Sequence, residues 1–155
     1  MLGTTRYMER KMKLRIVMLL ASALLALSPA NAEEILNATM FKQPYCSCCD
    51  GHAEHLRTNN FRVTVVETDQ LAKIKARHGV PPEFEGCHTL EIGGYVVEGH
   101  VPASVIRKLL KERPKIRGIS LPGMPDGSPG MGGTKREPFI VYEIGPSGGR
   151  VFAMD

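Results

Sequence analysis

Three of the chain's four cysteines crowd into four consecutive positions, and this cluster is the part of the sequence most able to do chemistry. Cys46, Cys48 and Cys49 stand in the segment PYCSCCDG, and Cys87 follows much later, directly before His88. Thiolate is the form of cysteine that binds soft metal ions and that attacks disulfides. The pattern is therefore typical of a metal site or of a reactive dithiol.

Three interpretations of the cysteines are open. An even number of cysteines is compatible with two structural disulfides, and the C-x-x-C pair Cys46 and Cys49 favours a reactive dithiol. Against structural disulfides, the adjacent Cys48 and Cys49 do not readily bridge each other, and a chain of this length buries enough core without such bridges. We favour a metal site built from all four thiolates. The N-terminus of the predicted helix that follows would stabilise three of them in the thiolate form.

The residues that accompany the cysteines favour copper. His88 directly follows Cys87, and Met124 and Met131 lie in a Gly/Pro-rich segment. Thiolate and thioether ligands together select Cu(I), whereas zinc rarely uses methionine. Because four thiolates can bridge metal ions, several copper ions remain an alternative to one.

The methionines and histidines also have structural interpretations. Met124 and Met131 are explained equally well as gap-filling residues that pack on a core. His100 precedes a predicted helix and either caps it or orients a ligand. We expect His52 to be solvated, although its spacing allows it to share a helix face with the cysteines, and His55 is as readily a helix-surface residue as a ligand.

Alternating and helical patterns indicate which elements position these residues. Strands are predicted over residues 35–42, 61–68, 87–92, 95–98, 138–144 and 151–153, helices over 50–60, 70–78 and 102–112, and irregular structure over 121–133. This order indicates an α/β, thioredoxin-like fold, a mixed sheet with flanking helices and an appended Gly/Pro/Met-rich loop. Such a fold places the cysteine cluster at the start of the first helix, with Cys87 and His88 facing it.

Several motifs in order resemble one known family. They are PYCSCC (44–49), EHL (54–56), KARHGVP (75–81), CHT (87–89), GYVVEGHVP (94–102) and LPGMPDGSPGM (121–131). Together they resemble the CopG-type copper-resistance family, many members of which are catalogued only as a domain of unknown function. The resemblance covers about residues 36–152. Two positions depart from the family pattern: Ser47 stands where Gly is frequent, and His52 stands where Trp is common.

The resemblance implies a thioredoxin-like periplasmic protein whose C-x-C-C motif and distal cysteine bind copper as a thiolate-bridged cluster, with a copper redox role. The residues implied as copper ligands or their neighbours are Cys46, Cys48, Cys49, Cys87, Met124, Met131, His88 and His100. The departure at His52 implies less apolar cover on the helix, and either water or an added ligand there.

The N-terminal residues have the pattern of an export signal. Residues 1–15 are basic, residues 16–27 are an apolar run of twelve, and residues 28–32 end in a small-x-small pattern. We expect cleavage after Ala32, because the run is short for a membrane span, although an uncleaved anchor is an alternative. The mature domain, residues 33–155, would then lie in the oxidising periplasm. The chain's formal charge of +4 resides entirely in residues 1–32, so the remainder offers no electrostatic case for nucleic acid or an anionic membrane surface.

The sequence therefore predicts a periplasmic copper-binding protein for copper resistance or homeostasis, with copper ions and other periplasmic copper-handling proteins as its partners. A thiol–disulfide oxidoreductase using Cys46 and Cys49, and a copper chaperone, are the alternatives. Whether copper cycles between Cu(I) and Cu(II), which would make the protein a copper-linked oxidoreductase, stays open.

Overall fold

The structure is a computed structural model that describes residues 35–145 and 149–155. Its elements follow in the order β1 (Leu36–Lys42), α2 (Ser47–Thr58), β2 (Phe61–Glu67), α3 (Leu71–Arg77), the 3-10 helix η1 (Pro82–Phe84), β3 (His88–Ile92), β4 (Tyr95–Gly99), α4 (Ala103–Glu112), β5 (Gly118–Leu121), β6 (Ile140–Ile144) and β7 (Val151–Met154). This is the α/β class expected from the sequence. The predicted signal segment, residues 1–32, lies outside the described residues.

The strands form one mixed sheet in the order β2-β1-β3-β4-β5-β6-β7. β1 pairs in parallel with β2 and antiparallel with β3, and β3 pairs antiparallel with β4. β4 pairs in parallel with β5, and β6 and β7 continue the sheet antiparallel. Because parallel neighbours need a crossover, α2 links β1 to β2 and α4 links β4 to β5.

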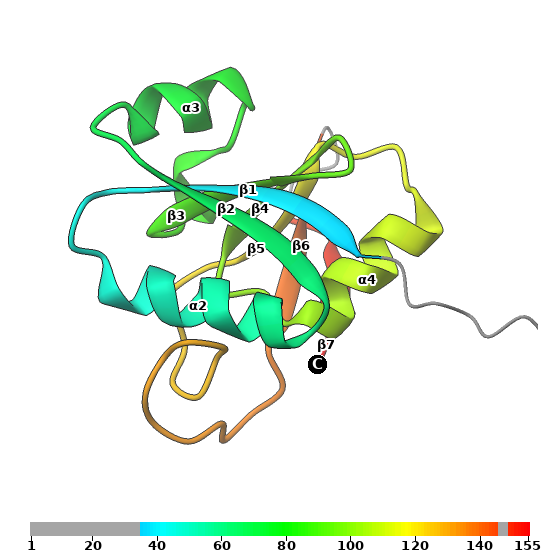
Figure 1. Ribbon diagram of the computed structural model, residues 1–155. Helices are drawn as coiled ribbons and strands as arrows, with labels where there is room; N and C mark the ends of the chain where they lie inside the picture. Colours follow the sequence, from blue (N-terminus) through cyan, green and yellow to red (C-terminus); the bar gives the residue numbers. More distant parts are fainter. Residues whose placement is uncertain (1–34, 146–148) are drawn as a thin grey trace, which may run out of the picture. The chain divides into compact units, whose positions relative to one another are not determined.

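Helices cover both faces of this sheet (Figure 1): α2 lies on one side of β1, and α3 lies on the other. The main core forms where α2 and α4 pack on the sheet. Its fully buried members include Met40, Ala53, Leu56, Leu90, Ile106, Leu109 and Ile119. A second, smaller cluster contains Val80, Phe84, Val96 and Ile144. The first core therefore holds α2, the helix that carries the cysteine cluster, against the sheet.

The helix that carries the cysteine cluster begins earlier than predicted. The expected range was 50–60, but α2 starts at Ser47 with Cys46 at its N-cap position. Cys48 and Cys49 therefore lie within the first helical turn, and the expected position of the cluster at the start of this helix is confirmed. The apolar spacing explains the difference, since α2 buries residues 49, 52, 53 and 56, a face that includes Cys49.

One strand was missed from the sequence. β5 occupies residues 118–121, all four of them buried, between β4 and β6. The prediction assigned Leu121 to irregular structure because the four residues GISL, directly before Pro122 and Gly123, are too few to carry a clear periodic signal. The predicted strands at 138–144 and 151–153 are confirmed as β6, which begins two residues later, and β7, which ends one residue later.

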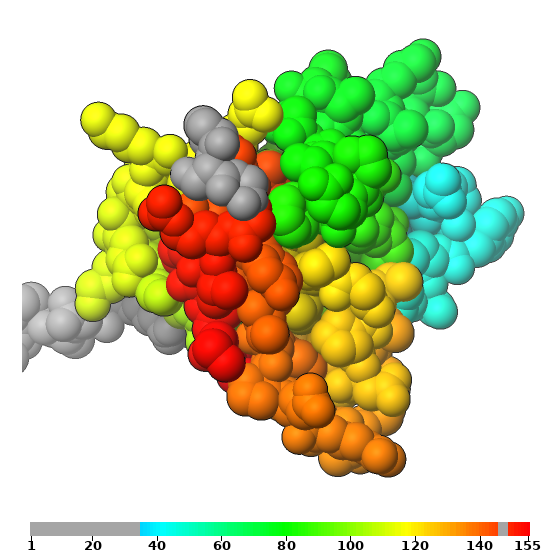
Figure 2. Space-filling view, turned by 180° about the vertical axis from the view of Figure 1, so that it is seen from behind, coloured from blue at the N-terminus to red at the C-terminus, as the bar shows by residue number. Residues whose placement is uncertain are grey.

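The predicted Gly/Pro/Met-rich loop is confirmed as a long irregular segment between β5 and β6. In Figure 1 it runs beneath α2, and Figure 2 shows its orange part projecting from one end of the molecule. Among the described residues, no helix is long and apolar enough to cross a membrane.

Candidate metal centre

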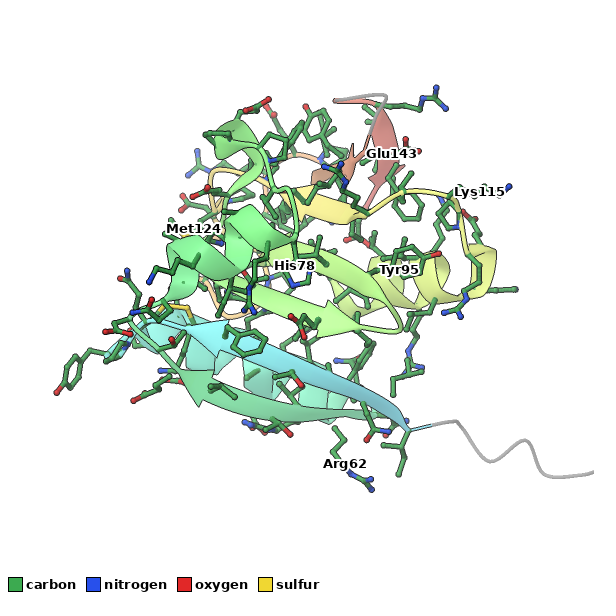
Figure 3. All side chains as sticks on the ribbon, turned by 90° about the horizontal axis from the view of Figure 1, so that it is seen from above. Arg62, His78, Tyr95, Lys115, Met124 and Glu143 are labelled. Atoms are coloured by element: carbon green, nitrogen blue, oxygen red, sulfur yellow. A yellow bond between two sulfur atoms is a disulfide. The ribbon has the colours of Figure 1, made fainter. Side chains whose placement is uncertain are left out.

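Strand pairing brings the distal cysteine to the cysteine cluster. β1 and β3 run antiparallel with Lys42 opposite His88, so the segment that leaves β1 lies beside the segment that enters β3. The first segment leads into α2 and carries Cys46, with Cys48 and Cys49 in the helix's first turn, and the second segment carries Cys87. Figure 3 shows the disulfide of the cluster as a yellow bond at the carboxyl end of β1. The predicted proximity of the four cysteines is therefore confirmed.

The four sulfur atoms form one group, within 4.8 Å of one another. Cys46 and Cys49 are joined by a disulfide, and Cys48 and Cys87 are free thiols. Cys87 Sγ lies 3.4 Å from Cys49 Sγ and 3.9 Å from Cys48 Sγ, and the Cys48 and Cys46 sulfurs are 3.5 Å apart. The alternative of two structural disulfides does not describe this site, because one bridge leaves two thiols free beside it.

The Cys87 thiol is held protonated by its surroundings. Burial, followed by the neighbouring Cys48 thiol, raises the pKa of Cys87 to about 12. A thiol of this kind is a weak nucleophile at neutral pH, and when it binds a metal ion its proton is displaced and released to solvent. Cys87 therefore suits metal binding better than it suits attack on a disulfide.

Two imidazoles converge on the same thiol. Cys87 Sγ lies 3.4 Å from His88 Nδ1 and 3.2 Å from His100 Nε2, and the three residues form a second group able to hold a metal ion. Both imidazoles are fully buried, and burial lowers the pKa of each. His100 Nδ1 donates to the Pro129 carbonyl at 2.6 Å, so its Nε2 presents a lone pair to the thiol. The structure thus brings His88 and His100 together with the cysteines.

His52 is not solvated, so the expectation from sequence was wrong. Its side chain is fully buried, and burial lowers its pKa to about 3. Its Nδ1 lies 2.9 Å from His88 Nε2, and its Nε2 lies 2.9 Å from the Val101 carbonyl. The spacing of position 52 relative to Cys49 and Leu56 was the available signal. His55, on the same helix, is half-buried, and its Nε2 accepts a hydrogen bond from the Ala103 amide at the start of α4.

The methionines lie on the loop that reaches the site, but the contacts that tie this loop to the site come from other residues. The Pro129 carbonyl binds His100, and Gly130 packs on the first turns of α2. Gly130 has φ +80°, and a Cβ there would lie 2.3 Å from the His52 amide nitrogen, so only glycine fits. Met131 is half-buried, and Met124, labelled in Figure 3, is 39% exposed.

A buried ion pair that sequence reasoning missed supports the segment carrying Cys87 and His88. Glu98, fully buried, accepts hydrogen bonds from the Gly86 amide (2.8 Å) and the Thr89 hydroxyl (2.7 Å). Lys75 donates to Glu98, and it also lies 3.1 Å from the Thr89 hydroxyl. Nothing in the sequence indicates that a lysine in a short helix and a glutamate in a strand will form an ion pair.

The site is reachable from solvent along one side. An open groove of about 430 Å³ is lined by residues of the β1–α2 turn, α3 and the segment before β3, among them Cys46, Lys75, Glu85 and Cys87. Small ions and reductants therefore have a path to the partly buried sulfurs.

The chain is similar to one protein family and to two solved structures. Residues 84–131 match the family described as "Protein of unknown function, DUF411". No curated protein matches the chain. Two solved structures are similar to it: "Copper resistance protein copG- Form 2", with 40% identity over 79% of this chain and 99% of that one, and "Copper resistance protein copG- Form 1", with 39% identity over 79% and 98%, each with a TM-score of 0.72. By this identity and coverage, the chain belongs to the CopG family of copper resistance proteins.

Proposed function

We propose that this protein binds copper as Cu(I) and serves copper resistance or homeostasis. The observation that carries the proposal is the convergence of three other cysteine sulfurs and two imidazoles on the Cys87 thiol in a member of a copper resistance family. Sulfur and imidazole donors fit copper, and thiolates favour its Cu(I) state. The proposed ligands are Cys46, Cys48, Cys49, Cys87, His88 and His100.

Loading of all four sulfurs requires reduction of the Cys46–Cys49 disulfide. A dithiol reductant supplies two electrons and two protons and leaves two thiols, with the reductant oxidised to its own disulfide. Copper binding then releases the thiol protons, including that of Cys87. With the disulfide intact, Cys48, Cys87, His88 and His100 remain as donors, and this smaller set gives the oxidised protein a way to keep copper while the thiolate set is incomplete.

The Gly/Pro/Met-rich loop is proposed to act as a lid, with Met124 or Met131 as a weak thioether ligand. The contact of Gly130 with α2 and the hydrogen bond from His100 to Pro129 support a loop that rests on the site. A multinuclear thiolate-bridged cluster and cycling between Cu(I) and Cu(II) are parts of the same proposal. The spacing of the four sulfurs is compatible with bridging.

We also propose that the fold is thioredoxin-like and that the protein is exported. Support for the fold comes from the strand order β2-β1-β3-β4, in which β1 and β2 are parallel and β3 is antiparallel to its neighbours, with cysteines at the start of α2. Export to the periplasm, with cleavage after Ala32, rests on the sequence pattern of residues 1–32.

A thiol–disulfide oxidoreductase is the second candidate, favoured by the Cys46–Cys49 disulfide at the start of a helix. That function would make Cys48 and Cys87 dispensable. It would also require disulfide reduction or isomerisation by the metal-free protein. A protein that reduces a test disulfide without copper, and still does so with both of these cysteines changed to serine, would favour this candidate.

The test of copper binding is anaerobic titration of the reduced mature domain with Cu(I) in competition with a chromophoric Cu(I) chelator. Cys48→Ser should lose most of the bound copper, because Cys48 Sγ adjoins both the Cys46 and Cys87 sulfurs. Ser47→Ala, an exposed neighbour in the same turn, is the matched control and should bind as the unmodified domain does. Full copper stoichiometry in Cys48→Ser would contradict the thiolate site.

A further inference from the structure

We propose that His52 is a positioning residue that fixes the tautomer of His88, so that the Nδ1 lone pair of His88 points at Cys87 and at copper bound there. The consequence for copper rests on the proposed function, whereas the tautomer itself is a property of the metal-free protein. The argument follows one line of hydrogen bonds, from the Val101 carbonyl through His52 and His88 to the Cys87 thiol.

The line starts at a group that can only accept. The Val101 carbonyl oxygen lies 2.9 Å from His52 Nε2, and a carbonyl has no proton to give, so the hydrogen must sit on His52 Nε2. Val101 is fully buried and directly precedes Pro102, the N-cap residue of α4. The backbone therefore fixes the position of this acceptor.

The next step follows from the burial of His52. Its side chain is fully buried, and the titratable groups that face it are three other imidazoles, those of His55, His88 and His100. With no carboxylate to stabilise a cation, His52 is neutral and carries one ring proton. That proton is on Nε2, so Nδ1 can only accept a hydrogen bond.

The acceptor on His52 then determines where the proton of His88 lies. His52 Nδ1 is 2.9 Å from His88 Nε2, so His88 must carry its proton on Nε2 and donate it. The other tautomer of His88 would leave two buried lone pairs facing each other at that distance with no proton between them. A neutral His88 protonated on Nε2 has its free lone pair on Nδ1, which lies 3.4 Å from Cys87 Sγ.

This arrangement makes His52 a partner of a ligand rather than a ligand. Both of its ring nitrogens are already engaged, so it offers no lone pair to a metal. His100 has an equivalent partner in the Pro129 carbonyl, which fixes its free Nε2 toward the same thiol. Side chains that orient metal-binding imidazoles in this way are worth about 10- to 100-fold in metal affinity.

The primary experiment is ¹⁵N-detected NMR of the imidazole rings in the metal-free mature domain with the disulfide intact. We expect His88 to show a protonated Nε2 and an unprotonated Nδ1. Three variants separate hydrogen bonding from packing. His52→Asn keeps an acceptor at the Nδ1 position, His52→Gln can reach the Val101 carbonyl but loses that acceptor, and His52→Phe keeps a ring with neither function.

The expected result is that His52→Asn retains the His88 tautomer, whereas His52→Gln and His52→Phe yield a mixture of tautomers and weaken Cu(I) binding about 10- to 100-fold. His55→Gln is the matched control, because His55 lies on the same helix and contacts His52 but does not reach His88. It should leave the tautomer and the copper affinity unchanged.

Two results would overturn the proposal. One is a wild-type His88 protonated on Nδ1. The other is a His88 tautomer that stays the same in folded His52→Gln and His52→Phe. If neither of these variants folds, the wild-type tautomer still decides. A wild-type domain with the expected tautomer that takes up no Cu(I) would instead refute the proposed function and leave the role of His52 toward His88 standing.

Discussion

Replacement of Gly130 by alanine tests whether the loop truly rests on the metal centre. A Cβ at position 130 would lie 2.3 Å from the His52 amide nitrogen, 2.6 Å from the Gly51 carbonyl carbon and 2.9 Å from the Cys48 carbonyl oxygen. All three are backbone atoms of α2, so no side chain can swing aside. Gly132, two residues along, is the matched control, because a Cβ there meets nothing within 4 Å.

The expected magnitude has two parts. A non-glycine residue at positive φ costs about 1–2 kcal/mol. To restore ordinary van der Waals contact, the loop must also move away from α2 by about 1 Å. This movement would break or lengthen the hydrogen bond from His100 to the Pro129 carbonyl, which contributes about 1 kcal/mol. Gly130→Ala should therefore lower the free energy of unfolding by roughly 2–3 kcal/mol, or about 8–12 °C in Tm for a domain of about 120 residues.

The assay is thermal and urea unfolding followed by far-UV circular dichroism, since the chain contains no Trp. Both variants are measured as oxidised, metal-free mature domains. Gly132→Ala should leave the stability unchanged or raise it by up to about 1 kcal/mol. The released His100 should also show a mixture of ring tautomers in Gly130→Ala. Equal stability of the two variants, with His100 unchanged, would refute the packing of the loop on α2.

Three further outcomes follow from the buried groups. Lys75→Met should destabilise the domain by about 3–5 kcal/mol in urea unfolding, because it leaves the buried Glu98 carboxylate without its cation. The double variant Lys75→Met/Glu98→Leu should recover much of that loss. Equal destabilisation by the single and the double variant would contradict the pairing. Because burial lowers the pKa of His52 to about 3, the unfolded chain takes up a proton there that the folded chain refuses. The free energy of unfolding should then fall as the pH drops below about 6.5. In folded His52→Phe this fall should be less steep, by up to about 1.4 kcal/mol per pH unit, than in the unmodified domain. Identical slopes in the two proteins would argue against a neutral buried His52. Because the pKa of Cys87 is raised to about 12, its alkylation in the metal-free oxidised domain at neutral pH should be roughly 1,000-fold slower than in urea, as followed by peptide mass spectrometry, and comparable rates would refute this protonated state.

The elements that repeat a clear period were predictable from the sequence. The alternation over residues 61–68 indicated β2, and the strands predicted over 87–92 and 95–98 are β3 and β4, a hairpin whose Gly93-Gly94 turn has positive φ at both glycines. β5 was missed because its four residues are too few to establish a period, and because all four are buried the polar Ser120 marks no solvent-facing side. Its place depends on β4 and β6, which a local pattern does not contain.

Some residues of the site were likewise predictable from the sequence, and others were not. The four cysteines and His88 were identified from residue type and spacing, and strand pairing then explains why they meet. Lys75 and Glu98 were not identified, because they come together only through the packing of α3 on β3 and β4. A polar residue on a short helix and another in a strand are normally solvated, and nothing local marks these two as exceptions.

The error at His52 has a physical origin that bears on how this centre is built. A histidine next to a cysteine cluster is expected to be either a ligand or solvated, and His52 is neither. Its two ring nitrogens are used by the Val101 carbonyl and by His88, while the Gly130 backbone closes against its amide. One residue of α2 therefore touches the chain before α4, the start of β3 and the loop after β5. A change of the His52 side chain should disturb the orientation of His88, whereas a change at Cys48 should remove a donor and leave that orientation intact. The two kinds of variant thus distinguish a copper site limited by its number of sulfur donors from one limited by the orientation of its imidazoles.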